Sequence, residues 1–426
     1  MAATAVTVGE LLKIVYGDTL RRTIPEEVTL LNWTQSKNKV WNEGQFFTEP
    51  VNLRRNPAHR FSAGEGGTLP VDAAQGYQMR RVGVRTAYAK VQFTRQMIER
   101  TESAPGKAAF AKVVSEEMEG IKRDAANNCD VHMYRDGTGI LAVSAANYAP
   151  GSTVITLNHY ANSWESGHPY GRARYFEVGD SVQFLNSVAP ATVRCTKTIT
   201  AVNYTNNTIT VAVLGALEGI TAGDFVVRGD ANGNEYNVCV EGLYNVFNDA
   251  TYQNIPRAAH PRWAAHIFNN AGALRPLKLH LIQRAIDYPA NVGFGDGADF
   301  ILSHTSIKEE YIRLVDGDLR YVTLDLVWKR GAKKLVWTHG DRDIPWDFGR
   351  NCPYHVLFAL DSSAFEWDIM TDWHWVDLDG NVMKYAGNNQ DNYFAYMAVD
   401  GNLSCNMPNK QVIITDIQVS PDSLPY

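Results

Sequence analysis

Cysteine is scarce in this chain of 426 residues, with five cysteines at positions 129, 195, 239, 352 and 405. Their number is odd, and no two have the short spacing of a zinc knuckle or a redox dithiol. A disulfide framework is therefore not expected, and folding in a reducing cytosol is the simple inference. Long apolar runs are missing as well: the longest uncharged stretch, at about 140–164, is rich in Ser, Asn, Gly and Tyr and cannot span a bilayer.

A strong charge of one sign is also absent. The chain has 40 Lys and Arg against 46 Asp and Glu, which gives a formal charge of -6. This balance argues against a protein that binds nucleic acid over its whole surface. The charges are nevertheless uneven, because residues 51–100 carry nine basic and three acidic side chains, whereas residues 361–400 carry one Lys and eight acids. The length predicts two to three domains, and the 45% hydrophobic content is typical of a globular protein.

The N-terminal fifth of the chain has little periodicity. Residues 1–44 are expected to form an arm, and from Glu43 to Tyr77 repeated Gly and Pro residues predict a long loop. Unstructured loops of this length are uncommon inside compact domains, so its partners are expected outside its own fold. Strict alternation then predicts a strand at about 82–93.

After Pro105 the hydrophobic period changes to three and four residues. This pattern predicts one amphipathic helix of roughly 28 residues, which ends at Asp136-Gly137-Thr138-Gly139. The side chains expected to pack from its apolar face are Phe110, Val114, Met118 and Ile121.

The second half of the chain mixes strands and helices. Short alternating runs over 150–232, with a hairpin at Asn206-Asn207, predict a small β-barrel or sandwich. Two helices are expected near 276–288 and 306–315, and the tail from about 328 to 417 is expected to be mainly strands. The fold class is therefore α+β.

Few motifs suggest chemistry. Tryptophans and carboxylates occur together between Glu366 and Asp379, as they do in a cleft that binds and cleaves a glycan, where two acidic side chains share the proton transfers of hydrolysis. Alternation along this segment favours a different interpretation, a solvent-facing acidic side of strands with tryptophans packed below. No catalytic residue, metal ligand or cofactor-binding residue is expected, and no cofactor.

The order of the parts resembles the major capsid protein of tailed bacteriophages, whose fold is shared with encapsulin shells and the floor domain of herpesvirus capsids. The resemblance rests on the strand Arg81–Lys90 leading into the long helix, and then on Glu241-Gly242-Leu243, Ile255-Pro256-Arg257 and Pro261-Arg262-Trp263. It implies the tailed-phage major capsid fold, with peripheral and axial domains, a spine helix and an inserted β-domain.

The resemblance also implies domain boundaries. They are an N-terminal arm at 1–44, an extended loop at 45–93, a peripheral domain with the spine helix at 94–149, an inserted β-barrel or sandwich at 150–235, an axial domain at 236–360, and a return to the peripheral domain at 361–426.

The implied function is a shell subunit that assembles into hexamers and pentamers of an icosahedral head enclosing double-stranded DNA, without sequence-specific binding. Expected partners are copies of itself, a separate scaffolding protein, a portal and a decoration or cement protein, with no membrane. The expected location is the virion, after assembly in the host cytoplasm. Two alternatives stay open: an encapsulin-like shell, and a carbohydrate-active enzyme or tail lectin that uses the Trp/Asp-rich C-terminal region.

Two features of the sequence bear on assembly. Some relatives cross-link a loop lysine to a neighbouring subunit, but no lysine lies between Lys39 and Lys90, so no such bond is expected. The uneven charge suggests that the loop arginines contact the acidic C-terminal stretch of the next subunit. The proposed contact residues are Arg54, Arg55, Arg60, Arg80, Arg81 and Arg85, facing Glu366, Asp368, Asp372, Asp377 and Asp379.

Overall fold

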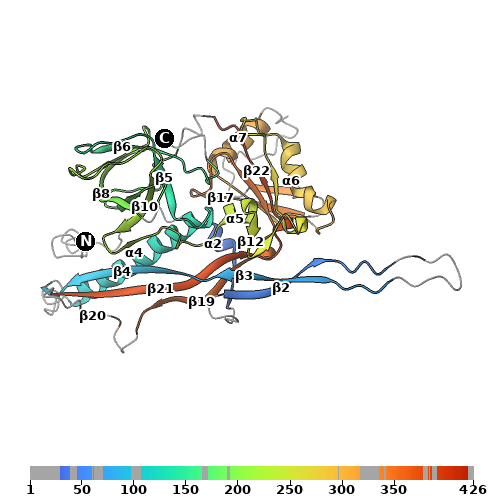
Figure 1. Ribbon diagram of the computed structural model, residues 1–426, viewed down its shortest axis with the longest axis horizontal. Helices are drawn as coiled ribbons and strands as arrows, with labels where there is room; N and C mark the ends of the chain where they lie inside the picture. Colours follow the sequence, from blue (N-terminus) through green and yellow to red (C-terminus); the bar gives the residue numbers. More distant parts are fainter. Residues whose placement is uncertain are drawn as a thin grey trace, which may run out of the picture.

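A computed structural model of the chain describes residues 29–38, 46–59, 61, 71–96, 107–165, 171–189, 192–295, 297–316, 335–339, 342–377, 382, 384–385 and 391–420. It mixes helices and strands, as the sequence predicts. Three bodies of β-structure surround one long helix, and a thin two-stranded ribbon projects from them (Figure 1). The predicted arm at 1–44 lies largely outside the described residues. No helix among the described residues is long and apolar enough to cross a membrane.

The first body is an elongated sheet made of segments from both ends of the chain. Strand β4 (Arg85–Thr94) pairs antiparallel with β21 (Asn392–Cys405), which pairs with β19 (Phe365–Trp375). Two short strands complete it: β1 (Gln35–Asn38) runs parallel to β19, and β20 (Lys384–Tyr385) pairs with β21.

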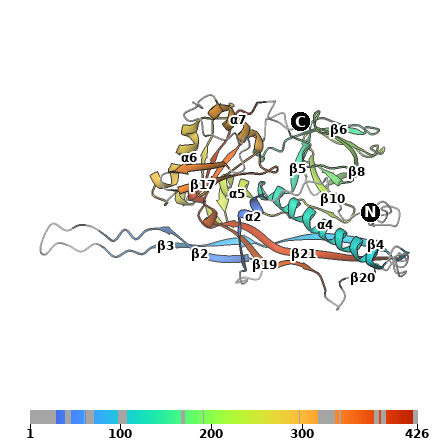
Figure 2. The same cartoon turned by 180° about the vertical axis from the view of Figure 1, so that it is seen from behind.

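Helix α4 (Lys107–Met133) lies along this sheet and packs against β4 (Figure 2). The predicted helix is therefore present, with nearly the predicted length. After Met133 the chain turns through Gly137 and Gly139, both with φ of 75°, which is the left-handed region that favours glycine. Ile121 is half-buried, while the side chains of Phe110, Val114 and Met118 lie outside the described residues.

The ribbon replaces the predicted loop. Strand β2 (Phe46–Arg54) pairs antiparallel with β3 (Gly76–Gly83), and β3 leads directly into β4. The prediction of an irregular segment from Glu43 to Tyr77 was therefore wrong at both ends. Val51 and Leu53 in β2 are half-buried against the core and alternate with the exposed Asn52 and Arg54. This alternation covers only four residues and follows Pro50, so it was too short to be recognised as a strand in the sequence.

The β-rich segment forms a barrel. Strands β10, β5, β6, β9, β8 and β7 pair in that order, and β7 pairs with β10 again, which closes the ring; β11 extends it beside β10. The bounds are β5 (Ile140–Ser144), β6 (Val154–Asn158), β7 (Ser181–Leu185), β8 (Val193–Asn203), β9 (Thr208–Val211), β10 (Phe225–Asp230) and β11 (Gly233–Asn234). The barrel thus begins about ten residues before the expected boundary at 150, and the hairpin turn at Asn207 (φ 52°) is as predicted.

The third body is a six-stranded sheet with two helices on it (Figure 1). The strand order is β14 (His266–Phe268), β22 (Val412–Ile414), β18 (Leu357–Leu360), β15 (Phe300–Ser303), β17 (Arg342–Phe348) and β16 (Leu335–His339). The helices are α6 (Leu279–Asn291) and α7 (Thr305–Asp316). Among the described strands after residue 361, β19, β20 and β21 belong to the first body and β22 belongs to this sheet. The expected return of residues 361–426 to a peripheral domain stays a prediction.

Smaller elements join the three bodies. They are α2 (Thr29–Trp33), α5 (Leu243–Asn248), the strand pair β12 (Thr251–Tyr252) and β13 (Ile255–Pro256), and three short 3-10 turns, η1 (Pro261–Trp263), η2 (Ser362–Ala364) and η3 (Pro408–Lys410). The backbone N–H groups of Leu30 and Leu31, in α2, donate to Asp130 Oδ1 on α4 at 3.0 and 3.3 Å.

Gly242 shows why the Glu-Gly-Leu tripeptide stands where it does. A Cβ atom at this position would lie 2.4–2.6 Å from the carbonyl oxygens of Arg135, Met133 and His132, at the end of α4. Only glycine allows this approach, and it places the fully buried Leu243 in the core. Trp263, also from the resembling segments, is buried in the same core and donates from Nε1 to the Tyr252 carbonyl at 3.1 Å.

A buried ionic group fixes the barrel to the six-stranded body. Arg174 Nη2 lies 3.0 Å from Glu165 Oε1, with both side chains almost fully buried. Arg174 also donates to the Cys352 carbonyl at 3.2 Å, and Glu165 accepts from the Tyr354 backbone N–H at 3.1 Å. Burial alone would raise the pKa of Glu165, but Arg174 and then His159 outweigh it and hold that pKa below its ordinary 4.5.

Candidate functional site

The outer end of the β2–β3 ribbon is the described part of the chain that the three bodies cover least. It extends away from the three bodies (Figure 1), and a two-stranded hairpin on its own is only marginally stable in water. Large apolar side chains are nevertheless exposed on it, including Tyr77 (63%) and Met79 (47%). An extended ribbon with uncovered apolar side chains has the character of an interaction surface.

Arg80 fixes the ribbon to the body. Its side chain is 1% exposed, and its Nε donates to Glu49 Oε2 at 3.0 Å across the ribbon. Its Nη1 donates to Gln253 Oε1 at 3.3 Å, and its Nη2 lies 3.6 Å from Glu366 Oε2 on β19. Three segments far apart in sequence therefore meet on one guanidinium group, at the point where the ribbon leaves the sheet.

This geometry corrects part of the predicted charge pairing. Arg80 is buried and is not a surface contact, and the buried side chains of Glu366 (2% exposed) and Asp368 (0%) do not contribute to an acidic surface. The attraction between the basic loop and the acidic C-terminal stretch does exist at this pair, but it acts within one chain. Sequence reasoning missed Glu49 and Gln253, because the antiparallel register that places Glu49 opposite Arg80 is known only from the fold.

The remaining predicted cations differ in exposure. Arg54, Arg55 and Arg81 are exposed, whereas Arg85 is half-buried and donates to the Asn237 carbonyl at 3.1 Å. Arg60 lies outside the described residues. Arg54 and Arg55 therefore lie exposed on the ribbon, whereas Arg85 points toward Asn237, in the segment that follows the barrel.

The remaining predicted acids lie beyond the buried part of β19. Asp372 and Asp377 are exposed, and Asp379 is outside the described residues. Trp373 and Trp375 are half-buried on the other face of the strand, as the predicted alternation requires. Glu366 and Asp368 are buried in the sheet, which leaves Asp372 and Asp377 as the exposed carboxylates among the described residues of this segment. The enzyme alternative is not favoured.

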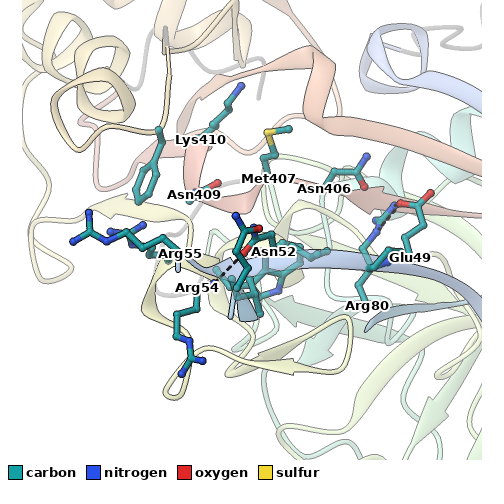
Figure 3. A pocket seen from close by; sticks show the side chains of 16 residues that line it. Glu49, Asn52, Arg54, Arg55, Arg80, Asn406, Met407, Asn409 and Lys410 are labelled. Atoms are coloured by element: carbon teal, nitrogen blue, oxygen red, sulfur yellow. Dashed lines mark hydrogen bonds and ion pairs between the residues drawn. The ribbon is translucent and has the colours of Figure 1, made fainter. Parts of the chain in front are cut away.

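A groove of about 600 Å³ runs along the base of the ribbon. Figure 3 shows Arg54 and Arg55 along one wall, with Lys410, Asn409, Met407 and Asn406 facing them from the turn after β21. Arg262 and Trp263 from η1 also line it. The lining side chains carry five positive charges, three of them on the ribbon, against the single carboxylate of Glu49. The groove therefore suits an anionic or polar segment of chain.

The cysteines support the sequence interpretation. All five are free thiols. Burial raises the pKa of the Cys405 and Cys129 thiols to about 12 in each case, so both are protonated at neutral pH.

No protein-family model matches the chain, and no curated protein sequence matches it. Solved structures do. The Cyanophage A-1(L) capsid asymmetric unit superposes with a TM-score of 0.52 and 11% identity, over 94% of this chain and 95% of that one. The chain has the fold of a phage capsid protein.

Two other structures cover the chain as fully. A Mycobacterium phage Bobi chain has a TM-score of 0.48 and 9% identity, with 98% and 99% coverage. The capsid of a native GTA particle gives 0.49 and 8%, with 94% of each chain covered. The superposition on the cyanophage A-1(L) capsid confirms the capsid fold predicted from the sequence. The spine-helix role of α4, the inserted origin of the barrel and the domain names remain predictions.

Proposed function

We propose that this chain is the major capsid protein of a tailed phage, and that the β2–β3 ribbon is its contact with the neighbouring subunit. The observation that carries the proposal is the ribbon itself: a long hairpin with exposed apolar and cationic side chains, in a chain with the capsid fold. Such a ribbon is stabilised when a second copy covers it, and repeated weak contacts of one kind favour a closed shell.

The shell would be built from hexamers and pentamers and would enclose double-stranded DNA. Its formal charge of -6 suits a wall that holds packed DNA without binding it tightly, because affinity for phosphates grows with the number of cations presented. A separate scaffolding protein, a portal and a decoration protein are the proposed partners, and the virion, assembled in the host cytoplasm, is the proposed location. The exposed Arg54, Arg55 and Arg81 stay as proposed contacts, with Asp372 and Asp377 as their proposed acceptors.

The test is assembly of the full chain, followed by sedimentation and electron microscopy. Wild-type protein is expected to form shells or capsomers. The double variant Tyr77→Ser with Met79→Ser is expected to remain as folded, unassembled subunits, because it removes apolar contact area from the ribbon without touching a core.

The control removes an even more exposed apolar side chain from the barrel. Leu217 is fully exposed, and Leu217→Ser is expected to assemble like wild type. If the wild-type chain stays monomeric, the capsid function is wrong. If the ribbon variant assembles as well as Leu217→Ser, the ribbon is not the contact.

A further inference from the structure

Three side chains that could ligate a metal meet where the chain leaves the barrel and passes the end of α4. His132 is on the last turn of α4, and Glu235 and Cys239 follow strand β11. One ligand atom from each lies within 4.8 Å of the others, and His132 Nε2 is 3.2 Å from Glu235 Oε2. His132 is 3% exposed, so the cluster is largely shielded from water.

We propose that His132, Glu235 and Cys239 form a binding site for a divalent transition metal of the zinc type. Imidazole nitrogen, carboxylate oxygen and thiolate sulfur are the three ligand types that zinc accepts in tetrahedral sites. Bonds of about 2.0–2.3 Å place tetrahedral ligand atoms roughly 3.3–3.8 Å apart. His132 Nε2 and Glu235 Oε2, at 3.2 Å, are already close to this separation.

The three ligands line a cavity with a volume of about 660 Å³ that lies between α4, β4 and the end of the barrel. Cys129 lies three residues before His132, on the same face of α4, and also lines this cavity, but its thiol is not one of the three groups that lie within 4.8 Å of one another. Cys239 is therefore the thiol ligand of the site, and the fourth position of a tetrahedral metal is left to water.

The surroundings of the cluster orient the ligands. Asn128 Nδ2 donates to Glu235 Oε1 at 2.9 Å, which leaves Oε2 directed at His132. Such a hydrogen bond to a ligating carboxylate is typical of metal sites. Nε2 is the His132 ring atom that faces Glu235 Oε2, while Nδ1 has no hydrogen-bond partner among the described residues. A metal held between Nε2 and Oε2 would replace this hydrogen bond.

Charge sets a condition on the site. Arg85 and Arg228 line the same cavity, and both guanidinium groups weaken the binding of a dication while stabilising a thiolate. Zinc binds cysteine as the thiolate, so binding releases the Cys239 thiol proton to solvent. The thiolate and the Glu235 carboxylate together neutralise the dication, so both ligands are required.

The metal would tie the exit of the barrel to α4. No metal ligand was predicted from the sequence, because His132 and Glu235 are 103 residues apart and only the fold brings them together. No short spacing of cysteines marks the site.

Cobalt binding by the full-length chain tests the proposal. Protein freed of metal with a chelator is titrated with Co²⁺ while the near-ultraviolet sulfur-to-cobalt charge-transfer band is followed, and Zn²⁺ is then added in competition. Wild type is expected to bind one Co²⁺ per chain with a thiolate band that Zn²⁺ abolishes. Cys239→Ser is expected to lose the band, Glu235→Gln to lose binding, and Asn128→Ala to bind about 10- to 100-fold more weakly.

Cys195→Ser is the matched control, because Cys195 is a buried thiol in the barrel core, outside this cavity. It is expected to keep wild-type affinity and the wild-type band. The proposal is overturned if wild type shows no saturable binding at one metal per chain, if the band survives Cys239→Ser, or if mass spectrometry finds a Cys129–Cys239 disulfide in the purified protein. Because the wild-type titration decides by itself, a variant that fails to fold does not remove the test.

Discussion

Replacing Arg80 with methionine removes the guanidinium group that joins the ribbon to the body while keeping a side chain of similar length. Gln253 then loses a hydrogen bond, and Glu366, which is 2% exposed, loses the cation 3.6 Å from its Oε2. Breaking a buried ion pair by removing one partner costs about 3–5 kcal/mol, because the remaining charge stays buried. Glu49 adds little to this figure, since its side chain is 40% exposed and screened by water.

A loss of that size is large against the stability of a whole domain, which is about 5–15 kcal/mol. It corresponds to roughly a hundredfold or greater change in the ratio of folded to unfolded chains. We therefore expect Arg80→Met to lower the midpoint of urea unfolding of unassembled subunits with little change in the slope, followed by tryptophan fluorescence.

Arg81→Met is the matched control, because it removes the neighbouring arginine, which is exposed. Its expected effect on the free energy of unfolding is within about 0.5 kcal/mol. If both variants unfold at the same urea concentration, Arg80 is not the anchor of the ribbon, and the reassignment of this residue from intersubunit contact to internal ion pair is wrong.

Three further predictions concern the body. Glu165→Gln should lower stability at neutral pH by about 3–5 kcal/mol, since it leaves Arg174 buried without its anion. Because the pKa of Glu165 is lowered in the folded protein, the wild-type protein should lose this contribution as the pH falls below about 4.5. A plot of Tm against pH should therefore be flatter for the variant than for wild type. Burial lowers the pKa of His304 to about 3, so wild type should also lose stability between pH 6.5 and 3, where only the unfolded chain takes up this proton, and His304→Asn should remove that part of the slope. Gly242→Ala should cost about 1–3 kcal/mol or prevent folding, because its Cβ meets three carbonyl oxygens, whereas Gly233→Ala, with open space around the new atom, should unfold at the wild-type midpoint.

The helix and the barrel strands were predictable because each buries one face of a regular element. The period of three and four residues after Pro105 and the alternation along the barrel strands both record that burial. The ribbon was predicted as a loop because its alternation is short: in β2 only Val51 and Leu53 alternate against the core, and the first four residues of β3 are exposed or half-buried.

Pairing partners could not be read from the sequence at all. The attraction between the basic loop and the acidic C-terminal stretch was predicted, but its placement between subunits failed for Arg80 and Glu366, because charge gives no information on burial. The same limit hid the cluster of His132, Glu235 and Cys239, whose members come together only when the barrel closes and returns the chain to α4.

The pairing of β4 with β21 has a consequence for the order of events during synthesis. The hydrogen bond from Thr86 to Asp400 joins residues 314 positions apart, so the strand that continues the ribbon has no neighbour in its sheet until β21 has left the ribosome. Contacts of such high sequence separation form late, because a long loop must close first. Glu366, which fixes the base of the ribbon through Arg80, is also synthesised long after the ribbon. A chain that has not yet been made as far as β21 therefore has no anchored ribbon to offer to its neighbours, and competence to associate begins only after β21 has been synthesised.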